Sequence, residues 1–462
     1  MKPLFVAALA GSLLCAGTAI ASPAAQAPDQ QALEIAKRAI GFRSVRGTGN
    51  QTPQLAAYLR SVLIDGGFAA DDVTVTPVDD TAYLVARFRG TDPAAKPLLL
   101  SGHIDVVEAK PADWTRDPFT AVVENGYLFG RGATDMKLDA AIAIATLIDL
   151  KRQGFRPTRD IVLELSGDEE TAMKTSALIA ERFKNAEMVL NIDGGGGRLS
   201  EDGKPQFFTW QGAEKTYADF RLTVTNPGGH SSAPRPLNAI NQLSAALVRI
   251  GDYHFPAQTN ELTRAYFRSA AKFKTGPIAQ AMARFAESPT DQQAIATLRA
   301  DPATVGQIGT TCVVTMVSGG HAENALPQRA TANINCRIFP GVAPKAVMEI
   351  LRTAAADPAV AFTDVTEGSV ANDASPMRPD FVKAVERAMG KAYPGVPVFP
   401  SMAAGASDSM WFRYHHVPSY GASPVFMKES DDFSHGLNER TPIASIAPSI
   451  VYYRSLLTDL AR

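Results

Sequence analysis

The sequence has no strong charge imbalance and, beyond its N-terminus, no long apolar run. Its 462 residues include 45 Lys and Arg against 47 Asp and Glu, which leaves a net charge of −2. That balance argues against a nucleic-acid surface or a polybasic membrane surface. Beyond the N-terminus, no stretch approaches the ~20 apolar residues of a membrane span. The length and the 45% hydrophobic content indicate a globular chain of two or three domains.

Cysteine is also scarce, with three residues in the whole chain. None has the spacing of a cysteine zinc site. Cys312 and Cys336 fall in predicted strands of one region, so a disulfide and two buried thiols both remain open. The glycine run Gly194–Gly197 lacks the lysine of a phosphate-binding loop, which excludes that kind of nucleotide site.

The N-terminus has the pattern of a secretory signal peptide. Lys2 precedes the apolar stretch Leu4–Ala16, and small residues then lead to Ala21. We predict that residues 1–21 are cleaved after export, which would make the protein periplasmic or secreted. Leu14 before Cys15 disfavours a lipid anchor, because a lipoprotein signal has a small residue there.

Strand and helix patterns alternate through residues 28–213 and return over 373–462. The apolar runs Pro97–Leu100, Asp160–Leu165 and Glu187–Ile192 lack clean alternation, as strands covered on both faces do. Met136–Gln153 is apolar nearly all round and predicts a buried helix. This part is therefore predicted to be an α/β domain with a mixed, mostly parallel sheet between helices.

Residues 214–372 have a different texture. A strand, a helix, two further strands and a helix follow in order, with a helical stretch at Asn260–Leu298 between them. This order predicts an α+β domain inserted into the α/β domain.

Acidic and histidine side chains come directly after several of the apolar runs. They are His103 and Asp105, Asp135 at a helix start, Glu169 and Glu170, Asp193, and His435 near the C-terminus. Each has an ordinary structural reading when taken alone, such as a helix N-cap for Asp135. Strand ends of a doubly wound sheet meet along one edge, however, where such folds bind ligands. Two histidines and three carboxylates at this edge suit a two-zinc site. Of the adjacent Glu169 and Glu170, one could hold a metal while the other moves a proton.

These motifs together resemble peptidase family M-twenty, the co-catalytic zinc carboxypeptidases, aminoacylases and desuccinylases. The matching segments are Ser101–Asp105, Gly130–Lys137, Gly167–Glu170, Asn191–Gly194 and the late His435. The resemblance implies a zinc-exopeptidase-like catalytic domain with an inserted lid that commonly dimerises, so a homodimer is expected. It also implies two zinc ions per chain, with cobalt or manganese as substitutes.

The resemblance implies a role for each matching residue of the catalytic domain. His103 and Asp193 would hold one zinc, Glu170 and His435 the other, and Asp135 would bridge them. Glu169 would be the general base, and Asp105 would support His103 as its partner on the second ring nitrogen.

In the lid, the resemblance implies that His230 reaches across a dimer toward the substrate carbonyl. Asn324 and Arg337 would contact substrate, and Gly405 and Ser407 would belong to a loop that accepts a substrate carboxylate on backbone N–H groups. Leu138 departs from the family pattern, which usually has glycine there, and the stretch Tyr253–Ala303 is longer than in compact members. The other histidines are read as structural or surface residues: His254, His321, His415 and His416.

The expected activity is hydrolysis of an amide bond next to a free carboxylate, as in a carboxypeptidase or dipeptidase, by metal-activated water. The substrate would be a peptide or an N-acyl amino acid, and an aminoacylase-like deacylase remains the alternative. An exported solute-binding protein would explain the export signal and two domains but not the ordered acid and histidine set. A catalytically dead relative is disfavoured because Glu169 and Glu170 are both present.

Overall fold

The computed structural model describes residues 26–462, and the predicted signal peptide at residues 1–21 lies outside this range. Within it, no helix is both long enough and apolar enough to cross a membrane. The helices are α1 (Pro28–Ile40), α2 (Thr52–Asp65), α3 (Lys137–Arg152), α4 (Lys174–Arg182), α5 (Ala239–Gly251), α6 (Glu261–Ala270), α7 (Gly276–Glu287), α8 (Gln292–Ala300), α9 (Pro302–Val305), α10 (Pro344–Ala355), α11 (Pro379–Ala392), α12 (Ser409–Tyr414) and α13 (Ile446–Leu460).

The strands are β1 (Val73–Val78), β2 (Thr81–Phe88), β3 (Leu98–His103), β4 (Val122–Glu124), β5 (Tyr127–Phe129), β6 (Ile161–Ser166), β7 (Met188–Asn191), β8 (Gly196–Leu199), β9 (Pro205–Glu214), β10 (Thr216–Thr225), β11 (Gly229–His230), β12 (Thr311–Gly319), β13 (Ala325–Leu326), β14 (Arg329–Ile338), β15 (Ala361–Asp364), β16 (Val398–Ala403), β17 (Ser419–Gly421), β18 (Phe426–Lys428) and β19 (Arg440–Pro442).

A mixed ten-stranded sheet forms the centre of the larger domain, as the sequence predicted. Its order is β1-β2-β6-β3-β7-β17-β9-β8-β18, with β16 paired to β9. The strands that carry the candidate ligands, β3, β6 and β7, are parallel neighbours. Their carboxyl ends therefore lie along one edge, which brings His103, Glu169 and Asp193 together from separate parts of the chain.

Helices cover both faces of this sheet. Successive side chains on a strand point to opposite faces, so each strand contributes to both cores. On β3, Leu98 and Leu100 pack into a core with α1, α2, α3, α11 and α13. Leu99 faces the opposite side, where α4 and α12 contribute Ile179 and Phe412. The expected buried helix is α3, whose residues from Lys137 to Ile148 are all buried.

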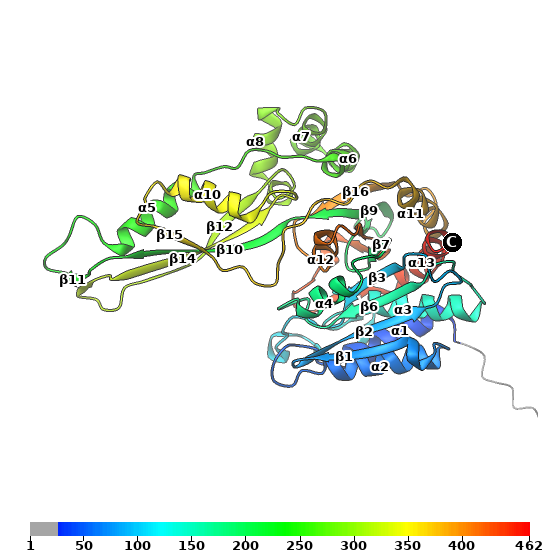
Figure 1. Ribbon diagram of the computed structural model, residues 1–462. Coiled ribbons are helices and arrows are strands. Elements are labelled where there is room, and N and C mark those ends of the chain that lie inside the picture. Colours follow the sequence, from blue (N-terminus) through cyan, green and yellow to red (C-terminus); the bar gives the residue numbers. More distant parts are fainter. Residues whose placement is uncertain (1–25) are drawn as a thin grey trace, which may run out of the picture.

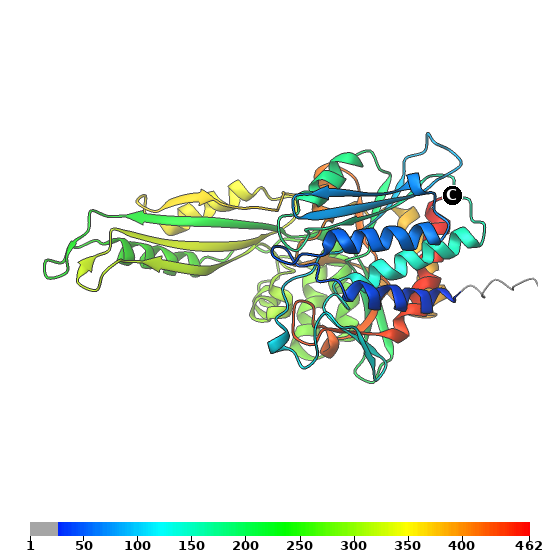
Figure 2. The same ribbon diagram turned by 90° about the horizontal axis from the view of Figure 1, so that it is seen from below.

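A second sheet, with the order β12-β14-β10-β15, projects away from the larger domain in both views (Figures 1 and 2). All its pairings are antiparallel. One face is covered by α5 and α10, whose apolar side chains share a core with β10 and β14. In chain order its elements are β10, α5, β12, β14, α10 and β15, so the predicted order of strand, helix, strand, strand and helix is followed by one further strand. Cys312 and Cys336, opposite each other on β12 and β14, form a disulfide.

Helices α6 to α9, at residues 261–305, pack on the larger domain although strands of the projecting sheet precede and follow them in the chain. Phe267 and Phe285 share a core with Phe399 of β16. Phe207 of β9 also contacts this core, with its ring 5.2 Å from that of Phe399. Figure 1 shows α6, α7 and α8 beside β9 and β16. We call this segment the helical insertion.

Candidate metal centre

Asp135 lies between the two histidines that the sequence singled out. Its Oδ1 atom is 2.9 Å from Nε2 of His103, and its Oδ2 atom is 3.1 Å from Nε2 of His435. A carboxylate that presents one oxygen to each of two imidazoles has the geometry of a bridging ligand.

The remaining two candidate ligands complete the groups on either side of Asp135. Asp193 Oδ1 lies 3.7 Å from Nε2 of His103. Glu170 Oε1 lies 3.0 Å from Nε2 of His435. The structure therefore brings together all five predicted ligands, in the two sets that the resemblance implied.

The donor set fits divalent cations. Ligand atoms of His103, Asp135 and Glu170 all lie within 4.8 Å of one another. Burial raises the pKa of Asp193 well above its ordinary value, and repulsion from Asp135 adds to this. Imidazole nitrogen and carboxylate oxygen are ligands that zinc accepts, and a cation would offset the excess negative charge.

Asp105 has two different contacts. The Nδ1 atom of His103 is 3.0 Å from the main-chain oxygen of Asp105 and 3.6 Å from its Oδ1 atom. The carboxylate accepts hydrogen bonds from the main-chain N–H groups of Glu169 (3.1 Å) and Glu170 (3.0 Å). Asp105 therefore orients the imidazole chiefly through its backbone and positions the two glutamates through its side chain.

The carboxylates of the two adjacent glutamates have different surroundings. Glu170 faces His435, whereas no hydrogen bond or ion pair within residues 26–462 engages the carboxylate of Glu169. Burial raises the pKa of Glu169 well above its ordinary value, although nearby His103 opposes the rise. The Glu169 carboxylate thus lies beside the ligand set and is available to accept a proton.

Glu439 holds the loop that carries Asp135, a role that the sequence did not reveal. Its Oε1 atom accepts from the N–H groups of Thr134 and Asp135, and its Oε2 atom from Gly132 and Arg131. Glu439 is fully buried. The only signal was its position four residues after His435.

Asp408 is a second buried acid that the sequence did not single out. Its Oδ2 atom accepts from Ser166 Oγ at 2.7 Å, which ties α12 to the end of β6. Burial raises the pKa of Asp408 to about 6. Its charge in turn raises the pKa of Glu169, after the larger effect of burial.

His230 and Asn324 lie together, but away from the metal ligands of the same chain. β11, which carries His230, pairs with β13 at the end of the projecting domain (Figure 1). The Asn324 main-chain oxygen accepts from Ser231 at 3.0 Å. Both residues are exposed, and Ser232 Oγ lies 2.7 Å from Nδ1 of His230.

Arg337 lies at the opposite end of the projecting sheet, close to the larger domain. It pairs in register with Tyr217 and Thr311, and its guanidinium lies 4.8 Å from the Tyr217 ring centre. Burial lowers the pKa of Arg337 from its ordinary range. No carboxylate within residues 26–462 forms an ion pair with it, which leaves its donors free for an anion.

The loop after β16 contains Gly405 and Ser407, which the family resemblance implied would offer backbone N–H groups to a substrate carboxylate. Within the described part of the chain, the N–H groups of Gly405 and Ser407 donate to no protein acceptor. The Ser407 hydroxyl is engaged inside the protein, where it donates to Glu214 Oε2 at 2.7 Å. Only the backbone of this loop could therefore receive a ligand.

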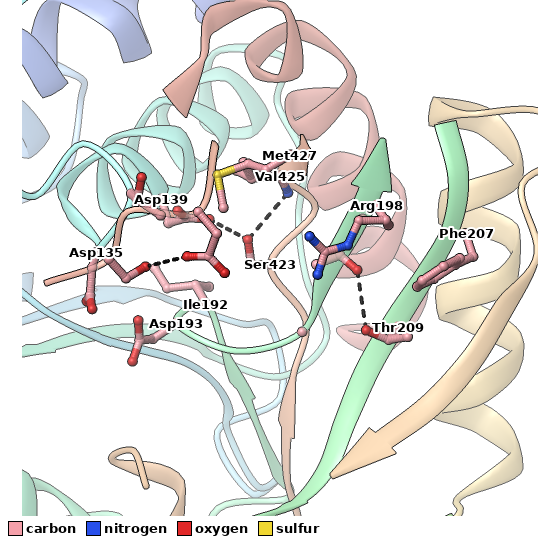
Figure 3. A pocket seen from close by; sticks show the side chains of 16 residues that line it. Asp135, Asp139, Ile192, Asp193, Arg198, Phe207, Thr209, Ser423, Val425 and Met427 are labelled. Atoms are coloured by element: carbon pink, nitrogen blue, oxygen red, sulfur yellow. Dashed lines mark hydrogen bonds between the residues drawn. The ribbon is translucent and has the colours of Figure 1, made fainter. Parts of the chain in front are cut away.

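A cavity of about 270 Å³ adjoins the ligand set. Asp135 and Asp193 line one side of it, and Arg198 and Phe207 line the other (Figure 3). Gly195 to Gly197 form part of its wall, which lets the backbone of β8 approach closely. A ligand in this cavity would contact the candidate metal position directly.

A model of peptidase family M20/M25/M40 matches residues 99–459, so the chain belongs to this metallopeptidase family. It is 29% identical over 388 residues to the N-fatty-acyl-amino acid synthase/hydrolase PM20D1 of Xenopus tropicalis, covering 81% of this chain and 74% of that protein. It is 25% identical over 396 residues to the probable carboxypeptidase S-like 2 of Dictyostelium discoideum, with the same coverage. Among solved structures, the metallo-carboxypeptidase Sso-CP2 from Sulfolobus solfataricus superposes with a TM-score of 0.71 at 20% identity, over 93% of this chain and 98% of that one.

Proposed function

We propose that this chain is an exported zinc-dependent hydrolase that cleaves an amide bond next to a free carboxylate, as a carboxypeptidase or dipeptidase does. One observation carries the proposal. Four candidate ligands converge around the fifth, Asp135, and the unengaged carboxylate of Glu169 lies next to them. Membership of a metallopeptidase family supports the reaction class.

His103, Asp135 and Asp193 would hold one zinc ion, and Asp135, Glu170 and His435 the other, with cobalt or manganese as substitutes. Bound zinc supplies Lewis-acid chemistry that makes water acidic and polarises a carbonyl group. The separation of roles between Glu170 and Glu169 follows from their contacts, since only Glu170 faces a candidate ligand.

Glu169 would act as the general base and then as the general acid. Its carboxylate takes a proton from the attacking water and delivers that proton to the amine that leaves. Its backbone N–H is fixed by Asp105, so the side chain starts from a defined position. A correctly placed base of this kind contributes roughly 10²–10⁴-fold to the rate.

Arg337 and the loop at Gly405–Ser407 would bind the free carboxylate of the substrate. Arginine donates two parallel hydrogen bonds to a carboxylate, and free backbone N–H groups add further donors. Arg337 belongs to the projecting domain and the loop to the larger one, so a carboxylate held by both would lie at the junction of the two domains.

We further propose a homodimer in which His230 completes the site of the partner subunit. Strand β12 is one of the two edge strands of its sheet, the other being β15. It exposes Val313 (59%), Met316 (70%) and Val317 (69%), an unusual apolar edge. A dimer through this edge would explain why His230 and Asn324 lie far from the ligands of their own chain. The His230 imidazole would donate to the developing oxyanion, an interaction worth roughly 10²–10³ in rate.

Export rests on the signal-peptide pattern of residues 1–21. The Cys312–Cys336 disulfide supports it, because such bonds persist mainly in oxidising compartments. The mature chain would then act in the periplasm or outside the cell.

The alternative is an N-acyl amino acid deacylase, which uses the same ligands, base and carboxylate-binding groups. The name of the Xenopus relative favours it. The experiment that decides is a panel of dipeptides and N-acyl amino acids, with matched substrates whose carboxylate is amidated. Hydrolysis that requires the free carboxylate and stops on zinc removal is expected. Equal cleavage of amidated substrates, or cleavage without metal, would contradict the proposal.

A further inference from the structure

A second cavity lies between the helical insertion and the β8–β9 strands. Its volume is about 450 Å³, within the ~300–1,000 Å³ range of small-molecule sites. Its apolar lining comes from both sides: Phe207 from β9, and Tyr266, Phe273, Ile278 and Met282 from the insertion. The Phe207 and Phe273 rings are 4.9 Å apart, so the two sides already meet at the wall of the cavity.

This cavity adjoins the one beside the metal ligands, with two lining residues in common. Arg198 and Phe207 line both cavities. Figure 3 shows them on the side of the first cavity opposite Asp135 and Asp193. The space under the helical insertion therefore begins on the far side of Arg198 and Phe207 from the candidate metal ligands.

Half of the residues that line the second cavity are polar or charged, and the other half are aromatic or aliphatic. Arg198, Lys274 and Glu429 are among the lining residues. Within residues 26–462, the Arg198 guanidinium has no ion pair or side-chain hydrogen bond. The alkyl stem of an arginine can pack along apolar surface while its charged end stays solvated, so Arg198 is no obstacle to an apolar group.

We propose that this second cavity is the subsite for an aliphatic acyl chain on the amine-acylating side of the scissile bond. The proposal deepens the proposed function and rests on it. Arg337 and the loop at Gly405–Ser407, which offer free donors for the carboxylate, line neither cavity. A substrate whose carboxylate they hold extends its other end past Asp135 and Asp193 toward Arg198.

The lining selects an acyl chain over a longer peptide. Each further peptide residue would bring one N–H and one C=O group, and burying these without partners is costly. The side chains of Phe207, Phe273, Ile278 and Met282 offer them none, and the polar groups of the cavity belong to other lining residues. An alkyl chain carries no polar group and gains free energy with every methylene that leaves water.

Three variants in the helical insertion test the subsite without touching the metal ligands. Ala303 lines the cavity from an exposed position, so Ala303→Phe narrows the cavity with little risk to folding. Ile278→Ala enlarges it. Ala283→Phe is the matched control, because Ala283 is exposed on the same insertion and does not line the cavity.

Each zinc-loaded variant is assayed for kcat/KM on N-acetyl-, N-octanoyl- and N-palmitoyl-leucine. We expect Ala303→Phe to reduce kcat/KM for the two long chains about tenfold, the value of burying roughly two methylenes. N-acetyl-leucine should change less than about twofold, because its acyl group has no methylene to bury in the narrowed cavity. Ile278→Ala should shift the preference toward the longer chain, and Ala283→Phe should match the wild type. An unchanged chain-length profile in both cavity variants would overturn the subsite.

A binding measurement separates this inference from the proposed function. Calorimetric titration of the full chain with dodecanoate needs no turnover. If the wild type and Ala283→Phe bind dodecanoate equally well and Ala303→Phe binds it more weakly, the subsite is supported even if no amide is cleaved. Equal dodecanoate binding by all variants overturns the subsite even if amides are cleaved. In the kinetic assay, a kcat/KM that depends on the amino acid side chain and not on the acyl chain overturns the assignment of the cavity to the acyl group.

Discussion

The carboxylate of Glu439 accepts a hydrogen bond from the backbone N–H of Asp135 at 2.9 Å. The same carboxylate binds Arg131 through a buried ion pair of 2.7 Å. Burial raises the pKa of Glu439, and the neighbouring Arg131 opposes the rise. The candidate bridging ligand is thus held by a buried acid that comes from the segment carrying His435.

We predict that Glu439→Gln weakens zinc binding by about 10–100-fold, the usual effect of losing a group that orients a ligand. The NH₂ group of the new glutamine side chain faces the N–H donors of Gly132 and Arg131 and cannot accept their hydrogen bonds. The loop that carries Asp135 then loses its fixed position. Zinc titration against a competing chelator measures the effect. Glu386→Gln, an exposed change on α11, is the control. Unaltered affinity in Glu439→Gln would show that the loop is held without this acid.

Subunit mixing tests the proposed contribution of His230 across a dimer. His230→Ala should lower kcat by roughly 10²–10³ without loss of zinc. Glu169→Gln should be inactive for a different reason. When the two inactive variants are mixed in equal amounts and their subunits exchange, half of the dimers contain one subunit of each kind. Each mixed dimer has one intact site out of two, so the mixture should recover about a quarter of wild-type activity. No recovery in confirmed mixed dimers would place His230 within its own subunit or outside the reaction.

The Cys312–Cys336 disulfide should stabilise the projecting sheet. It joins strands 24 residues apart in sequence, and a bridge of that span contributes about 2–4 kcal/mol. We expect the Cys312→Ala/Cys336→Ala double variant to lose hydrogen-exchange protection in β12 and β14 by about that free energy. Protection in β3 and β6 of the larger domain serves as the internal control. Equal protection in the variant and the wild type would contradict the prediction.

Lys215 should make stability depend on pH above neutrality. Burial lowers the pKa of Lys215 from 10.5 to about 7, with repulsion from Arg337 as the second cause. Between about pH 7 and 10.5 the unfolded chain holds a proton that the folded chain lacks. Unfolding therefore takes up a proton, and the contribution of Lys215 to the free energy of unfolding rises with pH.

We therefore expect Lys215→Met to be more stable than the wild type at pH 6, by on the order of 2 kcal/mol. The advantage should shrink as the pH rises through 7 toward 9.5. Urea unfolding of both proteins across this range measures it, with the exposed change Lys345→Met as the control. A stability difference that does not vary with pH would show that Lys215 titrates normally.

Four of the five candidate ligands could be predicted from sequence because each directly follows an apolar run or begins a helix. His103, Glu170 and Asp193 follow β3, β6 and β7, which are neighbours in the sheet. Parallel strands leave their carboxyl ends at one edge, so the order of motifs was enough to group them. His435 has no such strand before it, and its place among the ligands came from the family resemblance.

The sequence could not predict which surface the helical insertion covers. The amphipathic pattern of α6 to α8 requires an apolar partner but does not identify it, and the partner is Phe399, far along the chain. The roles of the Glu439 and Asp105 carboxylates were missed for a related reason. Each is defined by backbone N–H groups brought close only by the fold, and a side chain that binds backbone leaves no pattern in the sequence.

Glu169→Gln gives the most direct test of the central claim, that five converging side chains hold metal while a sixth moves the proton. The purified variant and the wild type are analysed for zinc per chain and assayed on the same N-acyl amino acid or dipeptide. We predict two zinc ions in each protein, with turnover lost in the variant by roughly 10²-fold or more. Turnover near the wild-type rate in the variant, or a fully active protein without metal, would contradict the account.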